Sequence, residues 1–172
     1  FLIDENGISI LPITSLGLDH AAPTERISSG IPRLDMMLGG QGYYRGSSIL
    51  ISGTAGAGKS SMAAHFVNAA VTRGERCLYF AFEESERQIV RNMHSIGFEL
   101  APWIQRGLLQ VHSARPTLHG LEMHLVMMHK LIKEYQPQVV IIDPITNLTT
   151  IGTQSEVKAA LIRLIDFLKT QE

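Results

Sequence analysis

The most informative stretch of the sequence is Gly53-Thr54-Ala55-Gly56-Ala57-Gly58-Lys59-Ser60. A glycine, four residues and then Gly-Lys-Ser is the spacing of a loop that wraps its backbone N–H groups around phosphate groups. In such a loop the lysine brings positive charge to the terminal phosphates, and the serine hydroxyl binds Mg²⁺. A glycine-rich turn with a surface lysine would give the same letters. The context favours the phosphate site, because a strand-like run (49–52) precedes the loop and a helical pattern follows it.

Further apolar runs alternate with helical patterns along the rest of the chain. The runs at 49–52, 77–82, 108–112 and 139–142 lack polar–apolar alternation, as strands buried on both faces do. Helical patterns are found at 59–72, 85–96, 118–135 and 155–169, and a short helix is expected from Pro32 to the Gly39-Gly40 pair. This alternation predicts an α/β fold with a mainly parallel sheet and helices on both faces.

The first 25 residues lack the alternation of strand-like and helical patterns that the rest of the chain shows. Two short apolar pieces flank Asn6-Gly7, which is a hairpin turn signal. Residues 13–25 have a mixed composition typical of a linker, and the main domain is expected to begin at Arg26.

Composition excludes several classes of protein. The 172 residues carry 15 Lys and Arg against 16 Asp and Glu, a formal net charge of −1, which argues against nucleic-acid binding. The single cysteine, Cys77, excludes an internal disulfide and a cysteine-based zinc site. No apolar run is long enough to cross a bilayer, and no signal peptide is visible, so we expect a cytoplasmic protein.

Acidic residues follow two of the expected strands. Asp143 ends the run Val139-Val140-Ile141-Ile142, and in a parallel sheet this places a carboxylate at the edge where ligands bind. It would hold Mg²⁺ through a water, although a turn aspartate before Pro144 is the alternative. Glu83 and Glu84 follow the run that ends at Phe82. One of them could act as a general base, or both could be acids that open the next helix.

Arg91 has two interpretations. It lies four residues after Arg87 on the expected helix, and the pair could form a solvated or interface edge. Alternatively, Arg91 contacts the nucleotide.

Several of these stretches together resemble the KaiC family of RecA-like ATPases. The resemblance is carried by the run from Arg26 to Asp35, the loop 53–60, Phe82-Glu83-Glu84-Ser85, Arg91-Asn92 and Ile142-Asp143. It covers nearly the whole chain. Residues 1–25 resemble the end of a first ATPase repeat and its linker, and residues 26–172 resemble the first part of a second repeat.

The resemblance implies a function. The family forms ATP-dependent hexamers that bind Mg²⁺ and ATP between subunits and hydrolyse ATP, and its second repeat can autophosphorylate Ser/Thr residues. Lys59, Ser60 and Asp143 match the phosphate and Mg²⁺ positions. Glu83 matches a catalytic base on the metal side and Glu84 its supporting partner. A homo-hexamer and clock-type partner proteins are implied for the intact protein. The competing hypotheses are an assembly module with negligible turnover and a DNA-binding RecA-type relative.

The chain departs from the family pattern at three points. Ile96 stands where clock members have an aromatic residue near the adenine, and Pro144 stands where they have a small hydroxyl residue. Thirdly, in RecA-like sheets another strand lies between the loop strand and the Asp-bearing strand, and here it would begin just past Glu172. We therefore expect a sheet that is incomplete on its C-terminal side. We also expect residues 1–172 to belong to a longer polypeptide, and to fold poorly and lack ATPase activity alone.

Overall fold

The computed structural model of the chain describes residues 2–4, 7–9 and 22–171. Two short strands, β1 (Leu2–Asp4) and β2 (Gly7–Ser9), pair antiparallel with Leu2 opposite Ser9. This pairing confirms the predicted hairpin, but Gly7, which was expected in the turn, is the first residue of β2 and pairs with Asp4; residues 5–6 lie outside the described residues. Most of the expected linker over 13–25 also lies outside them, and its last residues, 22–25, form no regular structure.

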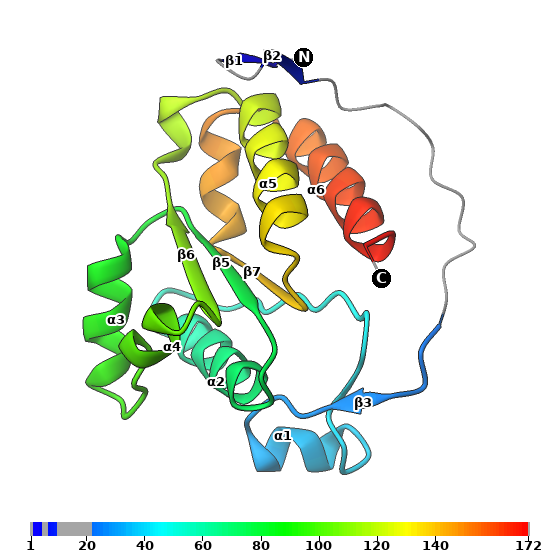
Figure 1. Ribbon diagram of the computed structural model, residues 1–172, viewed down its shortest axis with the longest axis vertical. Helices are drawn as coiled ribbons and strands as arrows, with labels where there is room; N and C mark the ends of the chain where they lie inside the picture. Colours follow the sequence, from blue (N-terminus) through cyan, green and yellow to red (C-terminus); the bar gives the residue numbers. More distant parts are fainter. Residues whose placement is uncertain (1, 5–6, 10–21, 172) are drawn as a thin grey trace.

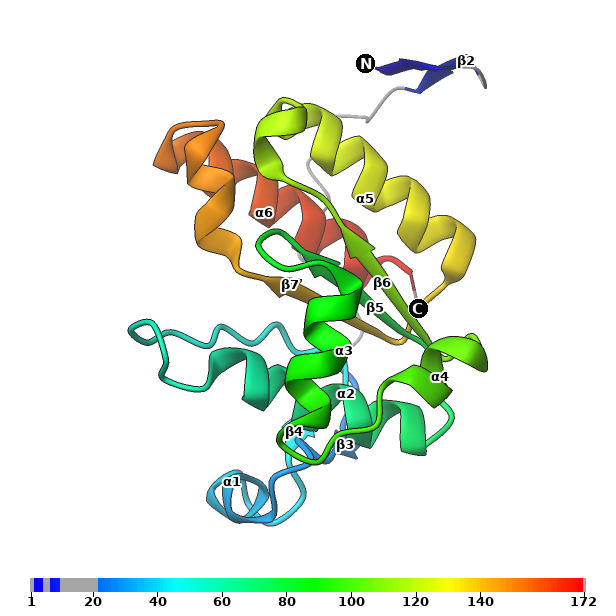
Figure 2. The same cartoon turned by 90° about the vertical axis from the view of Figure 1, so that its left-hand side faces the viewer.

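A three-stranded parallel sheet in the order β6-β5-β7 forms the centre of the fold (Figures 1 and 2). Its strands are β5 (Cys77–Ala81), β6 (Leu109–Ser113) and β7 (Val139–Asp143). Ala81 pairs with Ser113 on one side and with Asp143 on the other, so the carboxyl ends of all three strands finish level. The predicted α/β fold with a parallel sheet is confirmed.

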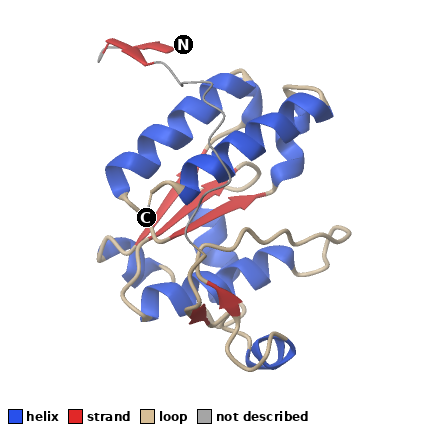
Figure 3. Cartoon of the chain, turned by 90° about the vertical axis from the view of Figure 1, so that its right-hand side faces the viewer, coloured by secondary structure: helices blue, strands red, loops and turns tan. Residues whose placement is uncertain are grey.

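Helices cover both faces of this sheet, as the sequence predicts (Figure 3). One face packs against α2 (Lys59–Thr72), α3 (Glu86–His94) and α4 (Ala101–Gln105), and the other against α5 (Leu121–Tyr135) and α6 (Gln154–Lys169). Successive side chains of a strand point to opposite faces. Tyr79 therefore joins the cluster around α2, whereas Leu78 and Phe80 join the cluster around α5 and α6.

The α2 helix contacts the sheet through small side chains. Ala64, Ala70 and Val67 are 2%, 0% and 0% exposed, and they belong to one core cluster with residues of β5. Because the distance between packed elements depends on the side chains at the contact, alanines let the helix backbone lie close to the strands.

The run at 49–52 is a correction to the prediction, because the structure forms no strand there. Residues 47–53 have no regular secondary structure, and Leu50 is 77% exposed. A strand needs a partner to satisfy its backbone N–H and C=O groups. Within the described ranges, no strand pairs with this segment, so an apolar sequence that favours β structure stays outside the sheet.

The other elements follow the sequence with small shifts at their ends. The first helix, α1, spans Pro32–Met37, and β3 (Arg26–Ile27) pairs antiparallel with β4 (Tyr43–Tyr44). The pattern at 118–135 divides into a 3₁₀ turn, η1 (Pro116–Leu118), and α5, because Gly120 interrupts it with an extended backbone. A second 3₁₀ segment, η2 (Ile145–Thr150), follows β7. In the part of the chain that is described, no helix is both long and apolar enough to cross a membrane.

The segment before α1 is held by a buried carboxylate. Asp35 accepts hydrogen bonds from the Ser28 hydroxyl and from the backbone N–H of Ser29 at 2.8 Å. Burial alone would raise the pKa of Asp35, but these hydrogen bonds bring it below its ordinary value. Gly30 lies next to α2 with a positive φ, and a Cβ there would come within 2.3 Å of the His65 carbonyl oxygen. Only glycine fits this position without a shift of backbone.

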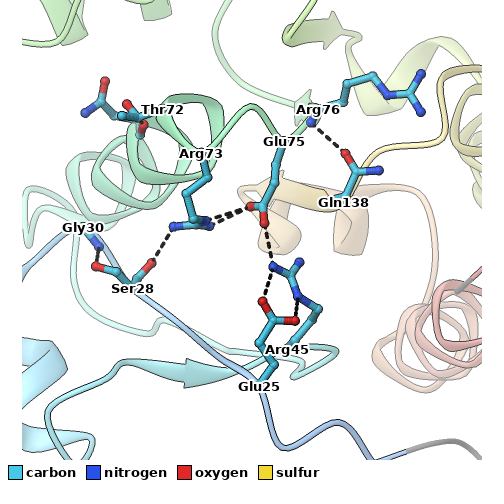
Figure 4. Close-up of polar contacts among 10 residues, drawn as sticks. Glu25, Ser28, Gly30, Arg45, Thr72, Arg73, Glu75, Arg76 and Gln138 are labelled. Atoms are coloured by element: carbon cyan, nitrogen blue, oxygen red, sulfur yellow. Dashed lines mark hydrogen bonds and ion pairs between the residues drawn. The ribbon is translucent and has the colours of Figure 1, made fainter.

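A network of charged side chains connects this N-terminal segment to the residues just before β5 (Figure 4). Arg45 lies between two glutamates, with its Nε 2.7 Å from Glu25 and its Nη2 2.7 Å from Glu75. Arg73 also donates to Glu75 at 2.7 Å. Burial alone would raise the pKa of Glu75, but hydrogen bonds from Arg73 and Arg45 lower it below the ordinary value. The Glu75 side chain, only 13% exposed, is the centre of the network.

We predict that Glu75→Gln destabilises the intact protein by about 1–3 kcal/mol, because two charge-assisted hydrogen bonds lose their acceptor charge. Glu122→Gln is the matched control: it breaks one exposed pair with Arg163, and its cost should stay below about 1 kcal/mol. Urea unfolding at neutral pH measures both.

The same pair of variants has a pH signature. Since the folded-state pKa of Glu75 is lowered, its contribution is present above pH 4.5, the ordinary value for this group, and is lost as the pH falls through the folded-state value. The difference between wild type and Glu75→Gln should therefore shrink in acid. Equal effects of the two substitutions at neutral pH would contradict the central role of Glu75.

Candidate functional site

The loop 53–60 forms an exposed turn that leads directly into the N-terminus of α2. Gly56 and Gly58 have φ of +79° and +82°, and Gly58 is the left-handed N-cap of α2. Residues 53–57 are exposed, so their backbone is accessible. Lys59 lies across the start of the loop and donates from Nζ to the carbonyl oxygens of Gly53 and Thr54 at 2.9 Å each. Exposed N–H groups at a helix N-terminus, with an ammonium beside them, favour an anion.

Ser60 and Asp143 meet although 83 residues separate them. The Ser60 hydroxyl donates to Oδ2 of Asp143 at 2.7 Å. Ser60 is in the first turn of α2, and Asp143 is the last residue of β7. The peptide bond from Asp143 to Pro144 is cis. Two hard oxygen donors thus stand together at the carboxyl edge of the sheet, where parallel α/β folds bind their ligands.

A residue that sequence reasoning missed, Tyr79, completes this contact. Its hydroxyl donates to the same Oδ2 of Asp143 at 2.6 Å. Burial, and then the negative charge of Asp143, raise the pKa of the phenol, so the hydroxyl stays protonated and remains a donor. One feature of the sequence could have indicated this role: Tyr79 brings a hydroxyl into a strand that is buried on both faces, where the hydroxyl needs a hydrogen-bond partner.

The two glutamates lie at the same edge but differ in their contacts. Glu84 accepts a hydrogen bond at Oε1 from the side-chain amide of Asn92, in α3, at 2.7 Å. Glu83 is exposed and makes no hydrogen bond or ion pair with any described residue. Both precede Ser85, the N-cap of α3, whose hydroxyl takes part in a capping box with Gln88. The acid in the first turn of that helix is Glu86.

The other expected ligands lie away from the loop. Arg91 is exposed, bonds Asn92, and lines an open cavity of about 500 Å³ between α3 and α4. No residue of the loop lines this cavity. Ile96 is 49% exposed after the end of α3. The structure brings neither of them into hydrogen-bond contact with Lys59, Ser60 or Asp143, so their roles stay predictions.

The residues present fit Mg²⁺ held together with a nucleotide. The described ranges hold no cluster of three or more His, Cys, Asp or Glu that could bind a metal ion without other ligands. Mg²⁺ is typically bound through one or two protein oxygens together with phosphates and waters. The Ser60 hydroxyl and the Asp143 carboxylate are such a pair, and the adjoining loop offers the phosphate donors. Glu83, which the sequence also suggested on the metal side, makes no hydrogen bond or ion pair with this pair in the described ranges.

Together, the parallel sheet, the glycine-rich loop and the Ser–Asp contact define a P-loop domain of the RecA-like class. A comparison with protein families agrees with this class: the model of the KaiC ATPase matches residues 27–172. The chain therefore belongs to the KaiC family of ATPases.

Curated relatives support the assignment. The chain is 55% identical over all its 172 residues to the "circadian clock protein KaiC2" of Synechocystis sp.. It is 38% identical over 171 residues to "circadian clock protein KaiC3" of the same organism, and 35% identical over 172 residues to the "circadian clock oscillator protein KaiC" of Picosynechococcus sp.. The chain spans 30%, 34% and 33% of the lengths of these three proteins.

Proposed function

We propose that residues 26–172 form a KaiC-type module that binds ATP with Mg²⁺ and hydrolyses it, and that residues 1–25 are the end of a preceding repeat and its linker. The observation that carries the proposal is the contact between Ser60 and Asp143, because it joins the phosphate loop to the acid of a distant strand. Membership of the family supports the ATPase activity.

Each residue has a role in this proposal. The loop N–H groups and Lys59 hold the phosphates, and Ser60 and Asp143 hold the cation. Bound Mg²⁺ would neutralise charge on the terminal phosphates. Glu83, exposed and unpaired among the described residues, takes a proton from the attacking water. Glu84 is held by Asn92 and supports it.

The wider activities of the family belong to the intact protein. We propose that it assembles as a homo-hexamer through the nucleotide-bearing surface, and that Ser/Thr autokinase activity, if the intact protein has it, uses the same site. The nearly balanced charge counts against a DNA-binding role. Light scattering with and without Mg²⁺ and ATP tests the assembly.

We predict that Lys59→Ala abolishes ATP binding by the intact protein, because the positive charge beside the loop is lost while the loop backbone remains. The matched control is Lys158→Ala, which removes an exposed ammonium from α6. Calorimetric titration with Mg²⁺ and ATP measures both variants. If Lys59→Ala binds ATP with wild-type affinity, the loop 53–60 is not part of the ATP site.

We predict that Glu83→Gln lowers ATP turnover by about 100-fold or more, the usual effect of losing a general base, while ATP binding is retained. Glu84→Gln should have a smaller effect, because an amide can still accept from Asn92. Glu86→Gln, the exposed acid in the first turn of α3, is the control.

Steady-state phosphate release checks this order. Wild-type turnover in a Glu83→Gln, Glu84→Gln double variant would show that neither acid takes part in hydrolysis. A wild-type protein that binds ATP and assembles without releasing phosphate would favour the assembly module.

A further inference from the structure

Tyr79 is a buried polar side chain that the proposed reaction leaves without a role. It lies in the middle of β5, is 4% exposed, and packs in the cluster that joins α2 to the sheet. Its hydroxyl ends on the carboxylate of Asp143 at 2.6 Å. Packing alone would be served as well by phenylalanine, so the hydroxyl is the part of this residue that needs an explanation.

The register of the sheet explains why this tyrosine reaches that carboxylate. In the β5–β7 pairing, Tyr79 lies opposite Ile141, and Ala81 lies opposite Asp143. Residues two apart on a strand point to the same face, so Tyr79 and Asp143 share the face covered by α2. Tyr79 is then the diagonal neighbour of Asp143, a separation that an aromatic side chain can span.

Two hydroxyls meet on one oxygen of this carboxylate. Ser60 donates to Oδ2 at 2.7 Å from α2, and Tyr79 donates to the same atom at 2.6 Å from β5. The other oxygen, Oδ1, accepts neither of these bonds. The two donors differ in freedom, because the Tyr79 ring is packed in the core whereas the Ser60 side chain is only partly buried. If the Ser60 hydroxyl turns to a cation, the Tyr79 bond can still hold the carboxylate.

We propose that Tyr79 is the positioning residue for Asp143: it holds the carboxylate in place for Mg²⁺ independently of Ser60. The inference rests on the proposed function. Groups that bond to metal ligands orient those ligands and commonly contribute 10–100-fold to metal affinity. Tyr79 acts through Asp143 and touches neither the nucleotide loop nor the reacting groups by any hydrogen bond in the described residues.

The test is Tyr79→Phe in the intact protein, which keeps the ring and removes the hydroxyl. Binding of a fluorescent ATP analogue is titrated with Mg²⁺ at fixed analogue concentration, and again with Mg²⁺ removed by chelation. The Mg²⁺ concentration for half-maximal binding should rise about tenfold, and metal-free binding should not change. Tyr135→Phe is the matched control: it removes a phenol that donates to Gly107 at 2.8 Å, before the amino end of β6.

A double-substitution cycle separates positioning from packing. In an Asp143→Ala background, Tyr79→Phe should add little to the change in Mg²⁺ requirement, because the acceptor through which Tyr79 acts is gone. Additive effects, or a Mg²⁺ requirement in Tyr79→Phe equal to that of wild type and Tyr135→Phe, would overturn the inference and leave the proposed function standing. Wild-type protein that binds no ATP analogue with Mg²⁺ would overturn the proposed function, and this inference with it.

Discussion

The parallel pairing of β5 with β7 is the constraint on which the site depends. It sets Asp143 level with Ala81, so the chain leaves both strands at the same edge of the sheet. The pairing continues one step further, because the N–H of Phe82 donates to the Asp143 carbonyl at 2.9 Å, and the Asn147 amide donates to the Phe82 carbonyl at 3.1 Å. One backbone bond and one side-chain bond thereby hold Phe82 beside the end of β7, so the two glutamates that follow it leave the sheet close to Asp143.

Around this edge, the elements are held by interactions of different strength. Buried apolar side chains on both faces hold the helices to the sheet, and these contacts supply most of the stability. The N-terminal segment is held by polar contacts, namely the hydrogen bonds to Asp35 and the charged network around Glu75. The loop itself is exposed and held mainly by its own turn and by Lys59. Buried contacts therefore hold the elements next to the sheet, whereas the exposed loop is held by a few polar contacts.

Sequence reasoning succeeded where the determining pattern is local. The spacing of Lys59 and Ser60 after the glycines marks the loop, and apolar runs mark β5, β6 and β7 to within a residue. It failed at 49–52, because strand formation depends on a neighbour that the local pattern does not specify. It also missed Tyr79 and the role of Asn92. A tyrosine in an apolar run is typical of a core residue, and an asparagine in a helix is typical of an exposed surface residue. Only the sheet register and the direction of α3 show what these residues contact.

The alanines of α2 have a consequence for the chemistry. Ser60 stands at one end of the helix, and Ala64 and Ala70 set how far its axis lies from the strands. The separation of the Ser60 hydroxyl from Asp143 therefore depends on methyl groups in the core, about one turn (Ala64) and nearly three turns (Ala70) along the helix from Ser60. A bulkier side chain at Ala64 would act as a spacer, tilting the helix and drawing the two oxygen donors apart. The volume of the side chains in this part of the core therefore sets the distance between the two oxygen donors, and a core substitution can change that distance while Ser60 and Asp143 are unaltered.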